Sequence, residues 1–223
     1  MPKMRLKNTM PNKILNRKIH AQVANKKLVE ARHKQIFTAA IKLFSDRGFQ
    51  STTMRGIAST AGINLSQLYN YISSKDDILY LFYKHSYAQW MHFYDRLEDE
   101  EKDTVELLKD LVKSMLQYAH NKPKEILTLY TETRHLKHDY LHSVLDAESA
   151  MIKKLEYFIK RGTKEGVFRV NDPFIIANII QYLIVIEALR GWSIMEKYTF
   201  NKYANLITDI ILDLVGVKNK QKD

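Results

Sequence analysis

The chain has 223 residues, 45% of them hydrophobic, which is enough for one large or two small domains with a real core. It contains no cysteine, so disulfides and thiolate metal sites are excluded, and its seven glycines and four prolines favour long uninterrupted helices. The N-terminus shows no apolar segment typical of a secretory signal, so we expect a cytoplasmic protein with no membrane attachment.

The net charge of +10 is unevenly distributed. Residues 1–75 carry fourteen Lys or Arg against two acids, whereas the remainder carries twenty-one basic and twenty-three acidic residues. A need for solubility alone would spread the excess, while a phosphate-binding module concentrates it. The front third is therefore predicted to bind nucleic acid.

Residues 1–27 form a basic N-terminal arm with eight Lys or Arg and no acid. Such an arm could follow the phosphates or enter the adjacent minor groove, or it could be a solvated tail that only attracts DNA. Residues 14–28 have weak helical periodicity and could extend the first helix. A membrane-surface helix would need an aromatic or leucine-rich face, which this stretch lacks.

Residues 28–75 are predicted to be a three-helix DNA-binding domain. Ile36, Leu43 and Phe44 have the spacing of a helix with one buried face, and Gly48 ends that helix. A second helix begins after Thr52 or Thr53, either of which could cap it, and ends at residues 61–62. A three-residue turn then leads to a short third helix, residues 65–71, which makes the unit a helix-turn-helix.

The third helix is predicted to be the recognition helix, because the major groove of B-DNA admits a helix of this kind. Gln67 can pair with adenine, Ser66 with any polar base edge, and Leu65 can touch a thymine methyl group. The other candidates suit the DNA backbone, and the full predicted set is Thr53, Leu65, Ser66, Gln67, Tyr69, Asn70, Tyr71 and Lys75. Leu68 and Ile72 are instead expected in the core, and one of the two tyrosines could also be a core residue.

Residues 76–223 are predicted to form a helical ligand-binding and dimerisation domain, which makes the whole protein all-α. Ser74 caps a helix with an aromatic inner face that runs to about residue 96 and joins the two domains. The remaining predicted helices are residues 104–120, 123–135, 139–162, 173–198 and 200–215.

The last two predicted helices are unusually apolar. The run at residues 174–186 is interrupted by Asn178 and Gln181, and we expect it to be too short and polar to span a bilayer. Two such helices could form a homodimer through a four-helix bundle, or they could be ordinary core. A helix-turn-helix that reads two half-sites favours the homodimer.

A ligand cavity is predicted from aromatic and charged residues set into apolar helices. The candidate ligand-binding residues are Tyr87, Trp90, Tyr94, Tyr118, Tyr130, Arg134, Arg190 and Trp192. An arginine facing aromatic walls could bind the carboxylate or phosphate of a small molecule. Alternatively, either arginine could form an internal ion pair with Glu132 or Glu187.

No metal, cofactor or catalytic residue is predicted. His135, His138 and His142 have helical spacing, but imidazoles often occur so without a metal. The sequence contains no HExxH, GxSxG, P-loop or GxGxxG motif. Two alternatives to a regulator stay open: an enzyme with an all-helical pocket, and an architectural protein that binds DNA without sequence preference.

The first domain also resembles a known family. The pattern IxxAAxxLFxxxGFxxTTxxxIAxxAGIxxxxLYxYIxSKDDI is similar to the N-terminal domain of TetR-family bacterial transcriptional regulators. The chain departs from the family at Leu65, Ser66 and Ile72, which affects the expected DNA sequence preference. The resemblance implies a homodimeric repressor that binds palindromic double-stranded operator DNA and is released by a small-molecule inducer.

A looser resemblance concerns the ligand. The segments TLYTETRHLKHDYLHSVLDAE and LRGWSI are similar to a subgroup of that family whose members respond to acyl-CoA thioesters. This resemblance implies that the inducer is an acyl-CoA or another apolar-tailed anion.

Overall fold

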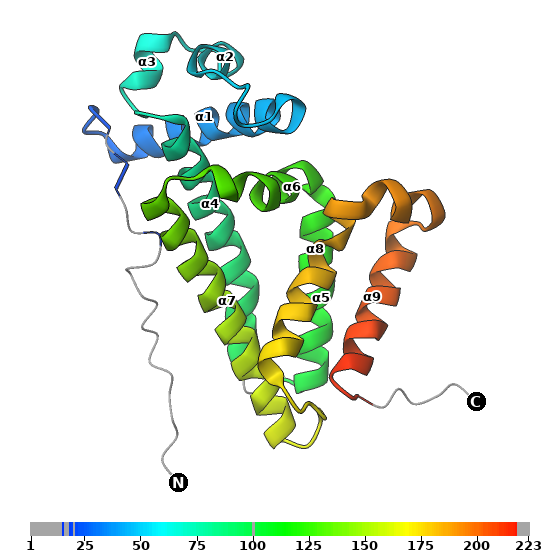
Figure 1. Ribbon diagram of the computed structural model, residues 1–223. Coiled ribbons are helices and arrows are strands. Elements are labelled where there is room, and N and C mark those ends of the chain that lie inside the picture. Colours follow the sequence, from blue (N-terminus) through cyan, green and yellow to red (C-terminus); the bar gives the residue numbers. More distant parts are fainter. Residues whose placement is uncertain (1–14, 16–17, 20, 100, 218–223) are drawn as a thin grey trace.

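The computed structural model describes residues 15, 18–19, 21–99 and 101–217, and over that part the chain is helical with no strand. The α-helices are α1 (Lys26–Arg47), α2 (Met54–Thr60), α3 (Leu65–Tyr69), α4 (Lys75–Asp95), α5 (Thr104–Asn121), α6 (Pro123–Glu132), α7 (His138–Lys164), α8 (Pro173–Lys197) and α9 (Phe200–Leu214). Figure 1 shows α1 to α3 as a head above a body of the later helices, with α4 running from one into the other. The predicted all-α architecture is confirmed.

Side-chain caps begin the helices of the head at the predicted residues. Thr53, Asn64 and Ser74 each accept a hydrogen bond from the backbone N–H three residues later, at 3.1, 2.7 and 3.2 Å. Each bond satisfies a backbone donor that has no partner within its helix. α3 is shorter than predicted, since it ends at Tyr69.

The start of α1 differs from the prediction. Its first residue is Lys26, and Asn25 caps it by accepting from Leu28 N–H at 3.2 Å. Residues 18–19 and 21–25 are not helical, so the expected helical extension through the arm is wrong in the described residues. The arm is tied to the head instead, because Gln22 N–H donates to Asn70 O at 2.8 Å.

The core of the head follows the apolar pattern. Leu68 and Ile72 are fully buried, as predicted. Gly48 takes a positive φ of 79° and ends α1, which lets Phe49 turn back so that its ring lies 5.0 Å from the ring of Phe44.

The helix that joins head and body, α4, is the most aromatic element of the core. It packs against α1, α5 and α7. Tyr80 and Tyr94 are fully buried, and Phe82, Tyr83 and Trp90 are nearly so.

The apolar helix α8 packs against α5, α6, α7 and α9. By length and composition alone its 25 residues could cross a membrane, because the helix extends beyond the run at residues 174–186 on which the prediction rested. Ile180 and Ile184 on its inner face are fully buried against the other helices. A kink at Arg190, where φ is −131°, separates the last two turns from the rest.

Gly162, near the C-terminal end of α7, lies where the packing leaves no room for a side chain. A Cβ at this position would lie 2.1 Å from Cδ2 of Phe168, whose ring is buried against α7. We expect Gly162→Ala to lower the free energy of unfolding by about 1–3 kcal/mol, because an overpacked site forces side chains or backbone to shift. The measurement is urea denaturation followed by circular dichroism.

Gly191→Ala is the matched control for this prediction. A Cβ at Gly191 would meet no atom nearer than 3.9 Å, and alanine has the higher helix propensity. We expect a neutral or slightly stabilising effect. Equal stability of the two variants would contradict the packing argument.

Candidate functional site

The recognition helix α3 is held in shape by a reciprocal cap. Asn64 Oδ1 accepts from Gln67 N–H at 2.7 Å, and Gln67 Oε1 accepts from Asn64 N–H at 3.1 Å. This capping box compensates for the shortness of a five-residue helix. It also means that Gln67 would pair with a base either through its NH₂ group or by leaving the cap.

The predicted DNA-binding residues have different exposures. Thr53, Ser66, Gln67 and Tyr69 are exposed. Leu65, Asn70 and Lys75 are half-buried. One surface, formed by the start of α2 and by α3, thus carries most of the predicted set.

Tyr71 departs from the prediction. Its side chain is 8% exposed and belongs to the core, whereas Tyr69 is 46% exposed. The backbone carbonyl of Tyr71 is within 2.9 Å of His33 Nε2, which fixes the turn after α3 against α1. Tyr71 was predicted to contact DNA, but its buried side chain has little surface to offer to DNA.

Lys75 also has a role that the sequence did not reveal. Its Nζ donates to the carbonyl oxygens of Phe49 (2.7 Å) and Gln50 (3.1 Å) and lies 4.7 Å from the centre of the Phe49 ring. Partial burial lowers the pKa of Lys75 from its ordinary value. In the unbound protein this lysine ties the start of α4 to the loop after α1.

The first turn of α4 forms the joint between head and body. Asp77, which is 6% exposed, accepts from the backbone N–H groups of Ser73 and Ser74, both at 3.0 Å, and from the hydroxyl of Tyr140 on α7. Asp76 accepts from Lys137 N–H at 3.0 Å. The two acids at the start of α4 therefore bind the corner before α7 and its first turn.

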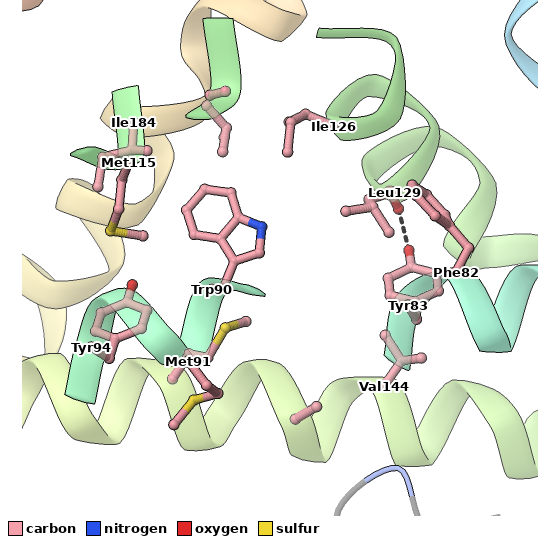
Figure 2. Packing of buried hydrophobic residues seen from close by; sticks show 14 of the residues in the cluster. Phe82, Tyr83, Trp90, Met91, Tyr94, Met115, Ile126, Leu129, Val144 and Ile184 are labelled. Carbon is pink, nitrogen blue, oxygen red and sulfur yellow. Dashed lines mark hydrogen bonds between the residues drawn. The ribbon is translucent and has the colours of Figure 1, made fainter. Parts of the chain in front are cut away.

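A cavity of about 40 Å³ lies in the body between α4, α6, α7 and α8. Three predicted ligand-binding residues line it: Tyr87, Trp90 and Tyr130. Figure 2 shows Trp90 and Tyr83 projecting towards Ile126 and Leu129, with the Tyr83 hydroxyl donating to the Leu129 carbonyl. The wall is therefore mainly aromatic and apolar.

One residue of the N-terminal arm reaches this cavity. Leu15 lines the wall and is 2% exposed, and Ile19 and Val23 pack against the core. Together with the bond from Gln22 to Asn70, these contacts place the described part of the arm between the cavity and the end of α3. The predicted phosphate or minor-groove role of residues 1–14 lies outside the described residues.

Tyr94 and Tyr118 stand behind the cavity wall. Tyr94 is fully buried and donates to Gln181 Oε1 at 2.5 Å, which orients an amide that does line the cavity. The Tyr118 ring meets the Trp90 ring edge-on at 5.6 Å, and burial raises the pKa of Tyr118 to about 12. Both tyrosines thus support lining residues.

Arg134, Arg190 and Trp192 lie outside the cavity, contrary to the prediction. Arg134 is exposed in the 3₁₀ turn that follows α6, where the chain leaves the bundle. The Arg190 guanidinium lies 5.3 Å from the ring of Trp192, which is 74% exposed. Helical periodicity predicts the wrong side-chain direction for both arginines, because Arg134 is in a turn and Arg190 is at a kink.

The acids suggested as partners for these arginines pair with histidines. Glu187 Oε1 lies 2.6 Å from His120 Nδ1, and Glu132 Oε2 lies 3.5 Å from His135 Nε2. The alternative of internal arginine ion pairs is therefore not what the structure shows.

Glu148 is a lining residue that the sequence analysis missed. The residue keeps contact with solvent at the rim of the cavity, yet its neighbours remove enough water to raise the pKa of its carboxyl. Burial, with the nearby Glu148 charge as a smaller cause, raises the pKa of Tyr83 and Tyr130. The signal was available, because Glu148 has helical spacing from Val144 and Met151 on the lining face of α7.

The three histidines considered for a metal have separate partners. His138 and His142 lie 2.9 Å apart on the surface of α7, whereas His135 contacts Gln50 at 3.2 Å and stacks on Phe49. Within the described part of the chain, no three His, Asp or Glu side chains are grouped so as to hold a metal ion.

Comparisons with known proteins agree with this geometry. Residues 36–80 match bacterial regulatory proteins of the tetR family, and residues 101–185 match the tetracyclin repressor-like C-terminal domain; together they span more than half of the chain. The chain is 27% identical over 185 residues to the HTH-type transcriptional regulator HbdR of Aromatoleum sp. (strain CIB), covering 83% of this chain and 81% of that protein.

Two solved structures share the fold. A bacterial regulatory protein in the tetR family from Rhodococcus RHA1 has a TM-score of 0.75 at 18% identity, over 84% of this chain and 98% of that one. AibR in complex with isovaleryl coenzyme A and operator DNA has a TM-score of 0.69 at 19% identity, over 80% of this chain and 97% of that one. The predicted head and helical C-terminal domain are thus confirmed.

Proposed function

This chain belongs to the tetR family of bacterial regulatory proteins, and from that premise we propose that it is a cytoplasmic transcriptional repressor. It binds a palindromic operator as a homodimer and is released by a small-molecule inducer. The observation that carries the proposal is the capped, exposed helix α3, which presents Ser66, Gln67 and Tyr69 on the cation-rich front third of the chain.

DNA recognition follows from the exposures on α3. Ser66 and Gln67, at its start, read base edges in the major groove, and Tyr69 and Thr53 hold phosphates on either side. The surplus of Lys and Arg over residues 1–75 supplies attraction to the backbone that does not depend on sequence.

The homodimer is proposed to form through α8 and α9. Their outward faces carry exposed apolar side chains: Phe174, Ile175, Ile179, Tyr182, Leu206 and Ile210. An apolar groove of about 410 Å³ runs along the same face of α8. A second copy of this face would cover these side chains and would place two recognition helices on one DNA duplex.

Release by an inducer is proposed to act through α4. The 40 Å³ cavity holds only a few water molecules, so a larger ligand must widen it by moving Trp90 and Tyr87, which α4 supplies. Because the first turn of α4 is bonded to head and body through Asp77, such movement changes the separation of the recognition helices. Half-sites must lie about 34–36 Å apart or at a multiple of that distance, so operator affinity falls.

One related structure and the residues of the cavity wall both indicate what kind of ligand this chain binds. AibR was solved with isovaleryl coenzyme A, whose acyl group is small and apolar. The wall of the cavity in this chain includes no lysine or arginine among its described residues. We therefore propose a compact, largely apolar ligand, and an anionic group on it would have to stay outside the cavity.

The test of DNA recognition is Tyr69→Ala. We expect its affinity for a duplex from the region upstream of its own gene to fall about tenfold, because a contact to DNA worth about 1–2 kcal/mol is lost. Thermal stability should be unchanged, since Tyr69 is exposed. Fluorescence anisotropy with labelled duplexes at fixed salt measures the affinity.

Tyr157→Ala is the matched control, because Tyr157 is a tyrosine of similar exposure, 51%, on α7 in the body. It should bind DNA like the wild type. Equal losses in both variants would contradict the assignment of α3. A wild-type protein that binds operator and random duplex equally would indicate the architectural alternative, and turnover of a substrate without DNA binding would indicate an enzyme.

A further inference from the structure

The chemistry of the cavity narrows the class of ligand further. Its wall combines the aromatic side chains of Tyr83, Tyr87, Trp90 and Tyr130 with a single carboxylate, that of Glu148. Glu148 forms no hydrogen bond or ion pair with any other described residue, and no described lysine or arginine faces it in the wall. Its carboxylate therefore stands at the exposed rim of an aromatic wall, with no protein partner in the described structure.

We infer that this cavity binds a small cationic ligand, an ammonium group on a compact apolar or aromatic body, with Glu148 as its counter-ion. This inference rests on the proposed function, in which the same cavity receives the inducer. The aromatic rings of Trp90, Tyr87 and Tyr130 attract a cation through their π-electrons. The apolar body of the ligand lies beside Ile126 and Met151 in a cavity that its entry widens, since the volume without ligand is only about 40 Å³.

The electrostatics of the wall agree with this assignment. The pKa of Glu148 is raised because water is partly removed from its carboxyl, so an unpaired negative charge is disfavoured there. A bound ammonium would relieve that cost, whereas a carboxylate or phosphate would add repulsion. An anionic inducer would need a basic residue, and the two arginines considered for that role, Arg134 and Arg190, lie outside the cavity.

The polar groups of the wall leave Glu148 as the centre of recognition. The Tyr83 hydroxyl is already donated to the Leu129 carbonyl, and the Gln181 carbonyl already accepts from Tyr94. Ser86, Tyr87 and Tyr130 also line the wall, but their hydroxyls are neutral acceptors, so a ligand ammonium finds its strongest acceptor in the Glu148 carboxylate.

The inference is tested with three probes that share one body: 3-phenylpropylamine, 3-phenylpropanol and 3-phenylpropionate. Calorimetric titration of the full-length protein at pH 7.5 should show the amine binding at least about tenfold more tightly than the alcohol, and the carboxylate most weakly. In Glu148→Gln the affinity for the amine should fall to that of the alcohol, and the alcohol should bind as in the wild type.

Asp146→Asn is the matched control, because Asp146 is, like Glu148, an exposed acid on α7, but it does not line the cavity. It should keep the full preference for the amine. The inference is overturned if the carboxylate binds best, if the amine preference survives in Glu148→Gln, or if the folded wild-type protein binds none of the amine.

The titration contains no DNA, so its result can reject the ligand class without rejecting the proposed function. A protein that selects operator DNA but ignores the amine would refute only the ligand class. A protein that binds the amine but shows no preference for any DNA sequence would refute the regulator and leave the cavity assignment intact.

Discussion

Ile179→Asp should separate the homodimer and lower operator affinity by about a thousandfold. Ile179 lies on the outward face of α8, lines the apolar groove and is 37% exposed in the single chain. In the proposed dimer this side chain is covered by a second copy, where an unpaired carboxylate would be buried at high cost. The substitution should leave the single chain folded, because that face meets water when no partner is present.

The size of the effect follows from losing one of two half-sites. Each base pair that a regulator reads contributes about 1–3 kcal/mol, so the loss of several costs about 4 kcal/mol, or a factor of about a thousand. Analytical ultracentrifugation gives the mass of the variant, and anisotropy gives its operator affinity at the same salt.

Leu145→Asp is the control for this prediction. Leu145 is an apolar residue with 45% exposure on α7, away from the groove of α8. This variant should stay dimeric and bind the operator like the wild type. A dimeric Ile179→Asp protein with normal affinity would show that α8 does not form the interface.

Asp77→Ala should lower the free energy of unfolding by about 3–5 kcal/mol. The buried carboxylate accepts from two backbone N–H groups and from the Tyr140 hydroxyl, and hydrogen bonds to a charged group contribute about 1.5–3 kcal/mol each without being additive. Removal of the acceptor leaves buried donors without a partner in the first turn of α4. Urea denaturation measures the loss.

Tyr140→Phe probes the same joint more gently. It removes one donor to Asp77 and keeps the buried ring that lies 4.9 Å from Tyr80. We expect a loss of about 1.5–3 kcal/mol, near-normal operator affinity and a weaker response to inducer, because α7 and α4 are then less firmly coupled.

The control for both joint variants is Asp110→Ala, which alters an exposed acid on α5. It should change the free energy of unfolding by less than about 0.5 kcal/mol. If Asp77→Ala were equally mild, the joint would not hold head and body together in the way proposed.

Local chemistry made the helices of the head predictable. Thr53, Asn64 and Ser74 cap their helices through contacts that span three residues, and such contacts depend on nearby sequence alone. The burial of Leu68 and Ile72 follows in the same way from helical spacing.

Side-chain direction between helices could not be predicted. Tyr69 and Tyr71 are two residues apart and chemically equal, and only the packing of the turn after α3 against α1 decides that Tyr71 is buried. Lys75 was assigned to phosphate because the sequence does not show that the carbonyls of Phe49 and Gln50 lie within its reach.

The ligand cavity was predicted less well than the DNA-binding surface, because it is assembled from four helices. Tyr87, Trp90 and Tyr130 were found as aromatic residues of amphipathic helices. Arg134 and Arg190 were misplaced since a 3₁₀ turn and a kink break the periodicity used to orient them. Glu148 was missed because an acid on a surface helix is usually solvated.

The central claim is that α3 reads DNA twice, once from each subunit of a homodimer. The most direct measurement is sequencing of the fragments that the purified protein retains from a random DNA pool at physiological salt. The account predicts an enriched inverted repeat whose half-site centres lie about 34–36 Å apart or at a multiple of that distance. A pool that stays random after repeated selection, or a motif without two-fold symmetry, would contradict it.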